Sequence, residues 1–141
     1  MKKYEYFDHT ADVGFFAYGK DAAELFKNAA LATTAQMVEV KDVKPNIEKK
    51  ISLKGNSLEG LLFDFLGELI YLKDADNLLF SRYDISIKKA GKDYKLTGAL
   101  KGDKINKETQ ELRNDVKAVT MHMFKIEKTK GGYKATIILD I

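Results

Sequence analysis

Apolar side chains recur at the helical spacing of three and four residues in two parts of the chain. The stronger stretch begins after Asn56 or Ser57, either of which is suited to cap a helix N-terminus. Its apolar positions are Leu58, Leu61, Leu62, Phe65, Leu66, Leu69 and Ile70. A second helix is predicted from Ala22 to about Val38, because Asp21 can cap it and Glu24 follows three residues later. Its core-facing stripe is expected to comprise Leu25, Phe26, Ala29, Ala32, Thr33 and Met37.

Elsewhere apolar positions alternate with polar ones, as in strands that bury one face. The predicted strands are residues 4–7, 13–18 and 47–53, followed by two hairpins, 78–89 with 94–100 and 124–128 with 133–139. Turns at 90–93 and at 131–132 contain glycine and separate the strands of each hairpin. About seven strands in hairpins beside two helices predict an α+β fold. We expect two helices packed on a mostly antiparallel, hairpin-rich sheet, in a single domain spanning residues 1–141.

Three connecting segments are less regular. The acidic stretch 74–77 is predicted to be a loop, and residues 101–115 are predicted to be mostly a loop of a length that is often functional or mobile. Periodicity does not decide whether residues 116–121 form a short helix or a strand.

Composition excludes several classes of protein. The chain has 141 residues, of which 45% are hydrophobic and 32% charged, so it is neither a disordered tail nor a fibre. The absence of cysteine excludes disulfides, thiolate zinc sites and a cysteine nucleophile. No apolar run approaches the roughly 20 residues that cross a bilayer, and the N-terminus lacks an apolar signal core. We therefore expect a soluble, cytoplasmic protein with no membrane contact.

The charge is nearly balanced, with 24 basic and 21 acidic residues and a net charge of +3. Only Arg82 and Arg113 are arginines, and arginine is the residue best suited to bidentate recognition of phosphates and bases. Direct reading of RNA or DNA is therefore poorly supported. RNA is expected to be a partner only indirectly, and any binding through lysines is expected to be nonspecific.

Two clusters of acidic residues could carry chemistry. The first is the segment Asp8-His9-Thr10-Ala11-Asp12, whose carboxylates could present oxygen ligands to a hard cation such as Ca²⁺ or Mg²⁺. The alternative is that Asp8 or Asp12 caps a turn and that His9 is a packed core histidine. The spacing alone leaves both interpretations open.

The second cluster is the C-terminal end, Asp140-Ile141, which follows a strand expected to lie deep in the sheet. A terminal carboxylate next to the Asp140 side chain would place two anionic groups together, and these repel each other unless a cation or a basic group lies between them. The alternative is a strand that ends at an exposed edge with a solvated Asp140. No P-loop, dinucleotide fingerprint, nucleophile elbow or HExxH motif is present, so the acids have no matched nucleophile.

The opening residues 4–14, YEYFDHTADVG, together with VKAVT at 116–120 and the closing ILDI at 138–141, resemble the archease family over the whole chain. The resemblance implies a small α+β domain that assists an RNA-splicing ligase in tRNA splicing. That ligase joins a 2′,3′-cyclic phosphate or 3′-phosphate end to a 5′-hydroxyl. The resemblance further implies that this chain is not itself an enzyme. Its implied role is to promote guanylylation of the ligase's active-site histidine and multiple turnover.

The resemblance also implies a divalent metal site formed by Asp12, Asp140 and an oxygen of Ile141, with Asp8 and His9 as possible additional ligands. Calcium is the ion it implies first, with magnesium or manganese as alternatives. Met121 departs from the family pattern, which has an aromatic residue there. In the 101–114 stretch, which lacks the proline and arginine expected from relatives, Lys104 and Lys107 are candidates only.

Two other hypotheses remain open at this level. The same acids could act on a substrate of their own in a stand-alone metal-dependent hydrolase, or the chain could be a chaperone-like binding module. The sequence does not reveal the oligomeric state, or which face would dock on the ligase.

Overall fold

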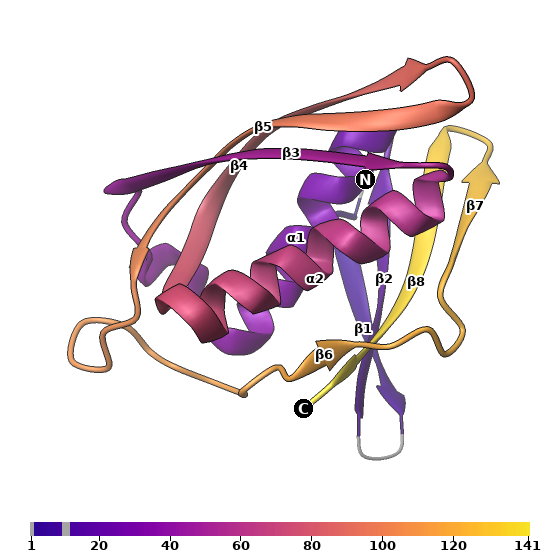
Figure 1. Cartoon of the computed structure of the whole chain (residues 1–141). Coiled ribbons are helices and arrows are strands. Elements are labelled where there is room, and N and C mark those ends of the chain that lie inside the picture. The colour runs from indigo at the N-terminus through magenta and orange to yellow at the C-terminus, as the bar shows by residue number, and fades with distance from the viewer. Residues whose placement is uncertain (1, 10–11) are drawn as a thin grey trace.

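Two antiparallel sheets share one hydrophobic core with two helices in the computed structural model of the chain, which describes residues 2–9 and 12–141 (Figure 1). The elements are β1 (Tyr4–His9), β2 (Asp12–Gly19), α1 (Ala22–Met37), the 3-10 turn η1 (Val40–Asp42), β3 (Ile47–Gly55), α2 (Leu58–Asp76), β4 (Leu78–Ala90), β5 (Asp93–Lys104), β6 (Ala118–Val119), β7 (Lys125–Thr129) and β8 (Gly132–Asp140). The α+β class is therefore confirmed.

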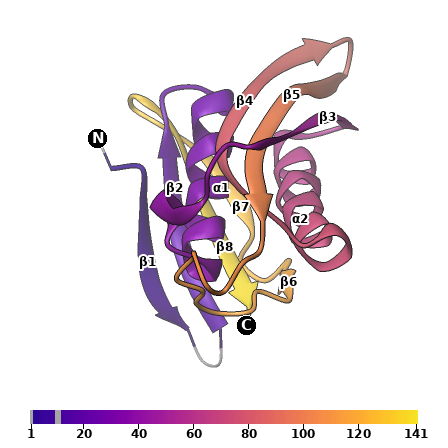
Figure 2. The same ribbon diagram turned by 90° about the vertical axis from the view of Figure 1, so that its left-hand side faces the viewer.

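The strands form two sheets, where the sequence suggested one. The five-stranded sheet has the order β1-β2-β8-β6, and β7 also pairs with β8. The second sheet has the order β3-β5-β4. Both helices pack against both sheets, as the two views show (Figures 1 and 2). Strand β8, whose residues Ala135 to Leu139 are buried, is the central strand of the five-stranded sheet, as its apolar sequence predicted.

Both helices begin where the capping residues predicted. The Asp21 carboxylate accepts a hydrogen bond from the Glu24 N–H at 2.9 Å, and the Ser57 hydroxyl accepts one from the Gly60 N–H at 3.0 Å. Ser57, and not Asn56, is therefore the cap of α2. Both predicted apolar stripes face the core, apart from the half-buried Leu58 at the first position of α2.

The end of α2 differs from the prediction. Residues 74–76, expected in an acidic loop, form the last turn of α2, which ends because Asn77 adopts a left-handed conformation with φ 55°. Carboxylates at a helix C-terminus are unfavourable because they face the negative end of the helix dipole. Here the Lys73 ammonium pairs with Asp74 at 3.0 Å, and Lys104 Nζ donates to the Asp76 carbonyl at 2.7 Å. Both contacts offset the local negative charge.

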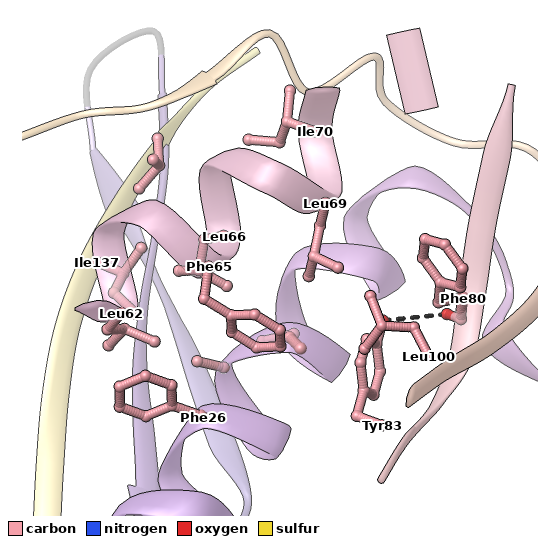
Figure 3. Close-up of a cluster of buried hydrophobic side chains, with 14 of the residues drawn as sticks. Phe26, Leu62, Phe65, Leu66, Leu69, Ile70, Phe80, Tyr83, Leu100 and Ile137 are labelled. Atoms are coloured by element: carbon pink, nitrogen blue, oxygen red, sulfur yellow. Dashed lines mark hydrogen bonds between the residues drawn. The ribbon is translucent and has the colours of Figure 1, made fainter. Parts of the chain in front are cut away.

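The aromatic rings of Phe26, Phe65 and Tyr83 connect α1 and α2 with the three-stranded sheet (Figure 3). Phe26 and Phe65 stack with their centroids 6.0 Å apart, and Phe65 meets Tyr83 edge-on at 6.4 Å. The buried Tyr83 hydroxyl is hydrogen-bonded to Thr34 Oγ1 and donates to the Phe80 carbonyl at 3.1 Å. The core therefore satisfies its buried hydroxyl while packing aromatic rings in offset geometry.

The segment between β5 and β6 is held against the body of the protein. Residues 101–104, predicted to be loop, continue β5 instead. Farther on, the Arg113 N–H donates to the Met37 carbonyl and the Asn114 N–H to the Gln36 carbonyl, each at 2.8 Å. The Arg113 guanidinium donates to the Ala35 carbonyl at 3.0 Å. These contacts satisfy carbonyls that the C-terminus of α1 leaves without helical partners.

In the part of the chain described, no helix is long and apolar enough to cross a membrane.

Candidate metal centre

Asp12 and Asp140, which stand near opposite ends of the sequence, are directly opposite each other in the five-stranded sheet. Strands β2 and β8 run antiparallel, and their register pairs Asp12 with Asp140. Residues directly opposite in such a pair have Cα atoms about 4.5–5.5 Å apart and side chains on the same face. Both aspartates are half-buried. The fold thus brings together the two carboxylates that the sequence presented as separate clusters.

The pair belongs to a row that crosses four strands at one end of the sheet. The register places His9 of β1 beside Asp12 and Ala118 of β6 beside Asp140. Asp8 stands one step along β1, opposite Val13. The Asp8 and His9 side chains, and Thr10 and Ala11 altogether, lie outside the described part of the structure. Their expected roles as ligands or as capping and core residues therefore stay predictions.

Asp140 does not lie at an exposed sheet edge. Strand β6 covers the other side of β8, where the Lys117 N–H donates to the Asp140 carbonyl at 2.8 Å and the Thr120 N–H donates to the Ile138 carbonyl at 3.0 Å (Figure 2). Ile141 is half-buried and packs against the core. The alternative of a strand that ends at an exposed edge is therefore wrong, because Asp140 lies between β2 and β6.

Electrostatics make this row a candidate cation site. Like charges directly opposite in a sheet repel, so two carboxylates here are unfavourable unless a positive charge lies between them. No lysine or arginine forms an ion pair with Asp140 among residues 2–9 and 12–141, as far as their side chains are described. The described side chains include no cluster of three His, Asp or Glu groups. Among the described side chains, the row therefore offers two carboxylates, and carboxylate oxygens are ligands that suit a hard cation.

Gly14, two residues after Asp12, allows β1 and β2 to pack closely beside the site. Gly14 lies on the same face as Asp12, and a Cβ atom there would stand 2.3 Å from the Phe7 ring. Phe7 therefore packs directly over the backbone of β2, and its ring also contacts Phe16 at 4.8 Å between centroids. This packing holds β1 against β2 close to the aspartate row.

Lys73 of α2 anchors the segment that leads into β6, on the other side of Asp140. Its side chain is only 7% exposed, and Nζ donates to the Val116 carbonyl at 2.8 Å and to the Asp115 carboxylate. Burial by itself lowers the pKa of Lys73, but hydrogen bonds and charges from Asp115 and Asp74 outweigh burial and raise that pKa. Lys73 thus fixes the segment that enters β6, beside Asp140.

Asp115→Asn tests this anchor through the pH dependence of stability. The hydrogen bond and charge of Lys73 lower the pKa of Asp115 below its ordinary value of 3.8. A lowered pKa stabilises the folded state above pH 4, and this stabilisation is lost as the pH falls through the folded-state pKa. We expect the variant to be about 0.5–1 kcal/mol less stable at pH 7, since Asp115 is exposed and solvent screens its charge. Urea unfolding at pH 7 and pH 3 measures the difference, which should be smaller at pH 3 than at pH 7. Asp64→Asn, on the exposed face of α2, is the control, and an equal loss in both variants at pH 7 would refute the anchor.

The two candidate lysines lie elsewhere. Lys104 is the last residue of β5 in the three-stranded sheet and is engaged with the Asp76 carbonyl at the end of α2. Lys107 is exposed in the turn that follows. Neither lies in the aspartate row.

Two exposed methionines lie near the site, of which the sequence marked only Met121, as a departure from the family pattern. Met121 and Met123 are 69% and 53% exposed, in the connection between β6 and β7. Met123 adopts a left-handed conformation with φ 57°. Exposed large apolar side chains that recur close together often mark contact surfaces, and methionine adapts well to different partners. The feature of the sequence that could have indicated this surface is the position of the two methionines on either side of His122, which is itself exposed.

Comparison with known proteins gives matches over essentially the whole chain. The profile of the Archease protein family matches residues 4–141. A protein archease of Methanothermobacter thermautotrophicus is 41% identical over 141 residues, which cover 100% of both chains. A protein archease of Methanosarcina mazei is 38% identical over 141 residues, covering 99% of this chain and 97% of the relative.

Two solved structures share the fold. A solution structure of a Methanobacterium thermoautotrophicum protein is 40% identical and superposes with a TM-score of 0.89 over 100% of both chains. A Thermotoga maritima crystal structure, described as an archease and possible chaperone, superposes with a TM-score of 0.64 over 96% of this chain and 94% of that one. Because that protein is only 24% identical, its likeness supports the fold alone.

Proposed function

Because the chain belongs to the archease family, we propose that it is an accessory factor for an RNA-splicing ligase in tRNA processing. In this role it acts in the cytoplasm on the ligase, which seals a 2′,3′-cyclic phosphate or 3′-phosphate end to a 5′-hydroxyl. It promotes guanylylation of the ligase histidine and multiple turnover, and it does not form the RNA bond itself.

The observation that carries this proposal is the pairing of Asp12 with Asp140 at one end of the five-stranded sheet. Attack of a histidine on GTP develops charge on phosphate oxygens, and that charge needs an electrostatic clamp. A pair of acids at the end of a rigid sheet can enter a partner's active site without rearranging, because β8 is hydrogen-bonded on both sides. The acids would position groups of the ligase, whose own residues perform the transfer.

We propose that Asp12, Asp140 and an oxygen of Ile141 hold a divalent cation, with Asp8 and His9 as possible further ligands. Calcium fits best, because it accepts carboxylate and main-chain oxygens in flexible numbers and keeps water where protein ligands are missing. Magnesium and manganese are the alternatives. The cation would supply positive charge that neutralises the two facing carboxylates and polarises phosphate oxygens.

The docking face would surround this site. The exposed Met121 and Met123 follow β6, whose residue Ala118 pairs with Asp140. Their apolar surface fits a protein partner better than it fits RNA. Lys104 and Lys107, which lie outside the aspartate row, would at most contact the ligase at the periphery.

Removal of the metal tests the proposal. The protein is stripped with a chelator and desalted before the ligase is added, so that the ligase keeps its own metals. We expect the stripped protein to lose its stimulation of guanylylation and to regain it when Ca²⁺ is returned. The measurement is incorporation of labelled GMP into the ligase with and without this protein, across Ca²⁺ and Mg²⁺.

Two results would contradict the proposal. Equal stimulation by stripped and reloaded protein would refute the role of the cation. Turnover of nucleotides or RNA ends by this chain without any ligase would favour the stand-alone hydrolase instead.

A further inference from the structure

The two long hairpins end in the same pattern of residues. Residues 89–94 read KAGKDY and residues 128–133 read KTKGGY. In each hairpin a lysine is paired across the strands with a tyrosine, Lys89 with Tyr94 and Lys128 with Tyr133. Each turn also contains a further lysine next to a glycine. The two hairpins belong to different sheets, so this correspondence is not a consequence of their pairing with each other.

The fold places the two patterns on opposite walls of one groove. Both hairpins extend beyond the helices on the same side of the molecule (Figure 1). The groove has a volume of about 390 Å³, and its lining includes both tyrosines, Lys89, Lys92 and Lys128. Its floor is the start of α2, where the Glu59 carboxylate accepts the Ile126 N–H at 2.8 Å and so ties the β7–β8 hairpin to the helix.

The charge of this end differs from that of the rest of the chain. Segments 88–95 and 125–134 each contain four lysines and one acid, so together they hold eight basic and two acidic residues. The remainder of the chain then has 16 basic and 19 acidic residues, since the totals are 24 and 21. The net charge of +3 therefore conceals a strongly basic end and a mildly acidic remainder.

The acids at this end are already engaged. Asp93 pairs with Lys54 at 3.4 Å, and Glu127 pairs with Lys125 at 3.6 Å. By contrast, Lys92, Lys128 and Lys130 are exposed and make no ion pair within the described residues. Unpaired lysines gathered around a groove attract a polyanion, because binding releases the counterions that the polyanion holds.

We propose that this groove binds single-stranded RNA through its sugar-phosphate backbone, with bases stacking on Tyr94 and Tyr133. Paired lysine and tyrosine side chains on two facing walls suit a polymer that alternates charged phosphates with flat rings. An acidic peptide does not carry a charge and a flat ring in every repeating unit, and a membrane surface cannot enter a groove between two hairpins. The scarcity of arginine excludes base-specific reading but does not oppose backbone binding through lysine.

The groove is separate from the aspartate row. Tyr133 and Asp140 lie seven residues apart on β8, which corresponds to roughly 23 Å along a strand. RNA binding therefore goes beyond the proposed function and does not require the metal. If the aspartate row contacts the ligase, the basic end lies away from that contact. An RNA strand could be bound there.

The test is fluorescence anisotropy with a labelled single-stranded RNA of about 12 nucleotides, a length within the range of known single-strand sites. The variant carries Lys89→Gln, Lys92→Gln, Lys128→Gln and Lys130→Gln. We expect its affinity to fall at least about tenfold at low salt, and the slope of log K against log salt to become shallower by about 2–3. A second variant, Tyr94→Leu with Tyr133→Leu, should bind at least about fivefold more weakly with an unchanged salt slope.

A matched variant controls for total charge. Lys41→Gln, Lys44→Gln, Lys49→Gln and Lys50→Gln remove four exposed lysines outside the groove and should leave affinity within about twofold. Equal losses in the two quadruple variants would overturn the proposal. So would tighter binding of polyglutamate or of anionic vesicles than of RNA, or an unchanged affinity in the tyrosine variant.

Failures of the two proposals can be told apart. Guanylylation of the ligase uses no RNA, so the groove variant should still stimulate it. Variants of Asp12 and Asp140 should still bind RNA. Loss of RNA binding in the aspartate variants would show that the groove is not an independent site.

Discussion

Asp12→Ala and Asp140→Ala are each expected to abolish stimulation of ligase guanylylation while leaving the fold intact. Each variant removes one of the two facing carboxylates, and the remaining carboxylate alone is not expected to hold the cation. Even loss of a residue that only supports a metal ligand typically costs about 10–100-fold in affinity, so loss of a ligand should cost about 100-fold or more. The measurement is the rate of GMP incorporation into the ligase at a fixed concentration of each variant.

A second measurement separates metal binding from docking. A cation that binds only the folded protein stabilises it, by about 2.7 kcal/mol when the free cation concentration is 100 times the dissociation constant. The melting temperature rises as a result. Wild-type protein should show this shift in Ca²⁺, and both variants should not. Asp84→Ala, an exposed aspartate on β4 of the other sheet, is the matched control and should behave like wild type. Unchanged stimulation by either site variant would show that the proposed site is wrong.

Phe65→Ala is expected to cause the largest loss of stability. Phe65 is fully buried between Phe26 and Tyr83, at the point where both helices meet the three-stranded sheet (Figure 3). Removing its ring loses the burial free energy and leaves a cavity that packed neighbours cannot fill, at a cost of about 3–5 kcal/mol. The melting temperature should fall by roughly 10 °C or more.

Tyr71→Ala provides the control for Phe65, since it lies on the same helix but is 61% exposed. Its expected cost is below about 1 kcal/mol, as for most surface substitutions. Calorimetry or urea unfolding measures both variants. Similar losses in the two variants would mean that α2 contributes through its helical backbone and not through this aromatic contact.

Local patterns predicted most of the elements correctly because their signals lie within a few residues. The caps Asp21 and Ser57, the apolar stripes of both helices and the glycine turns of both hairpins are confirmed. Residues 74–76 form the last turn of α2 and not the predicted loop. Their helical state depends on Lys73 and Lys104, and Lys104 is distant in sequence. The strand β6 also depends on a distant partner, β8.

The sequence indicated the two parts of the candidate site but not that they come together. Each acidic cluster suggested a cation by its own composition, but the spacing of Asp12 and Asp140 contained nothing that joined them. Only the resemblance to the archease family did so, and the register of β2 with β8 then placed them opposite each other. The lysine–tyrosine pairs of the two hairpins likewise appeared as unrelated turns until the fold placed them across one groove.

The sequence alone determined most of the secondary structure, the apolar core and the exclusion of thiol chemistry, because hydrophobic periodicity, capping and residue type act locally. The tertiary structure alone decided that there are two sheets, that Asp140 lies between Asp12 and β6, and that the basic and acidic ends lie at opposite ends of β8. These features depend on strand register and on contacts between distant segments. A register shift of one residue would turn every side chain of β8 to the other face without changing its local pattern.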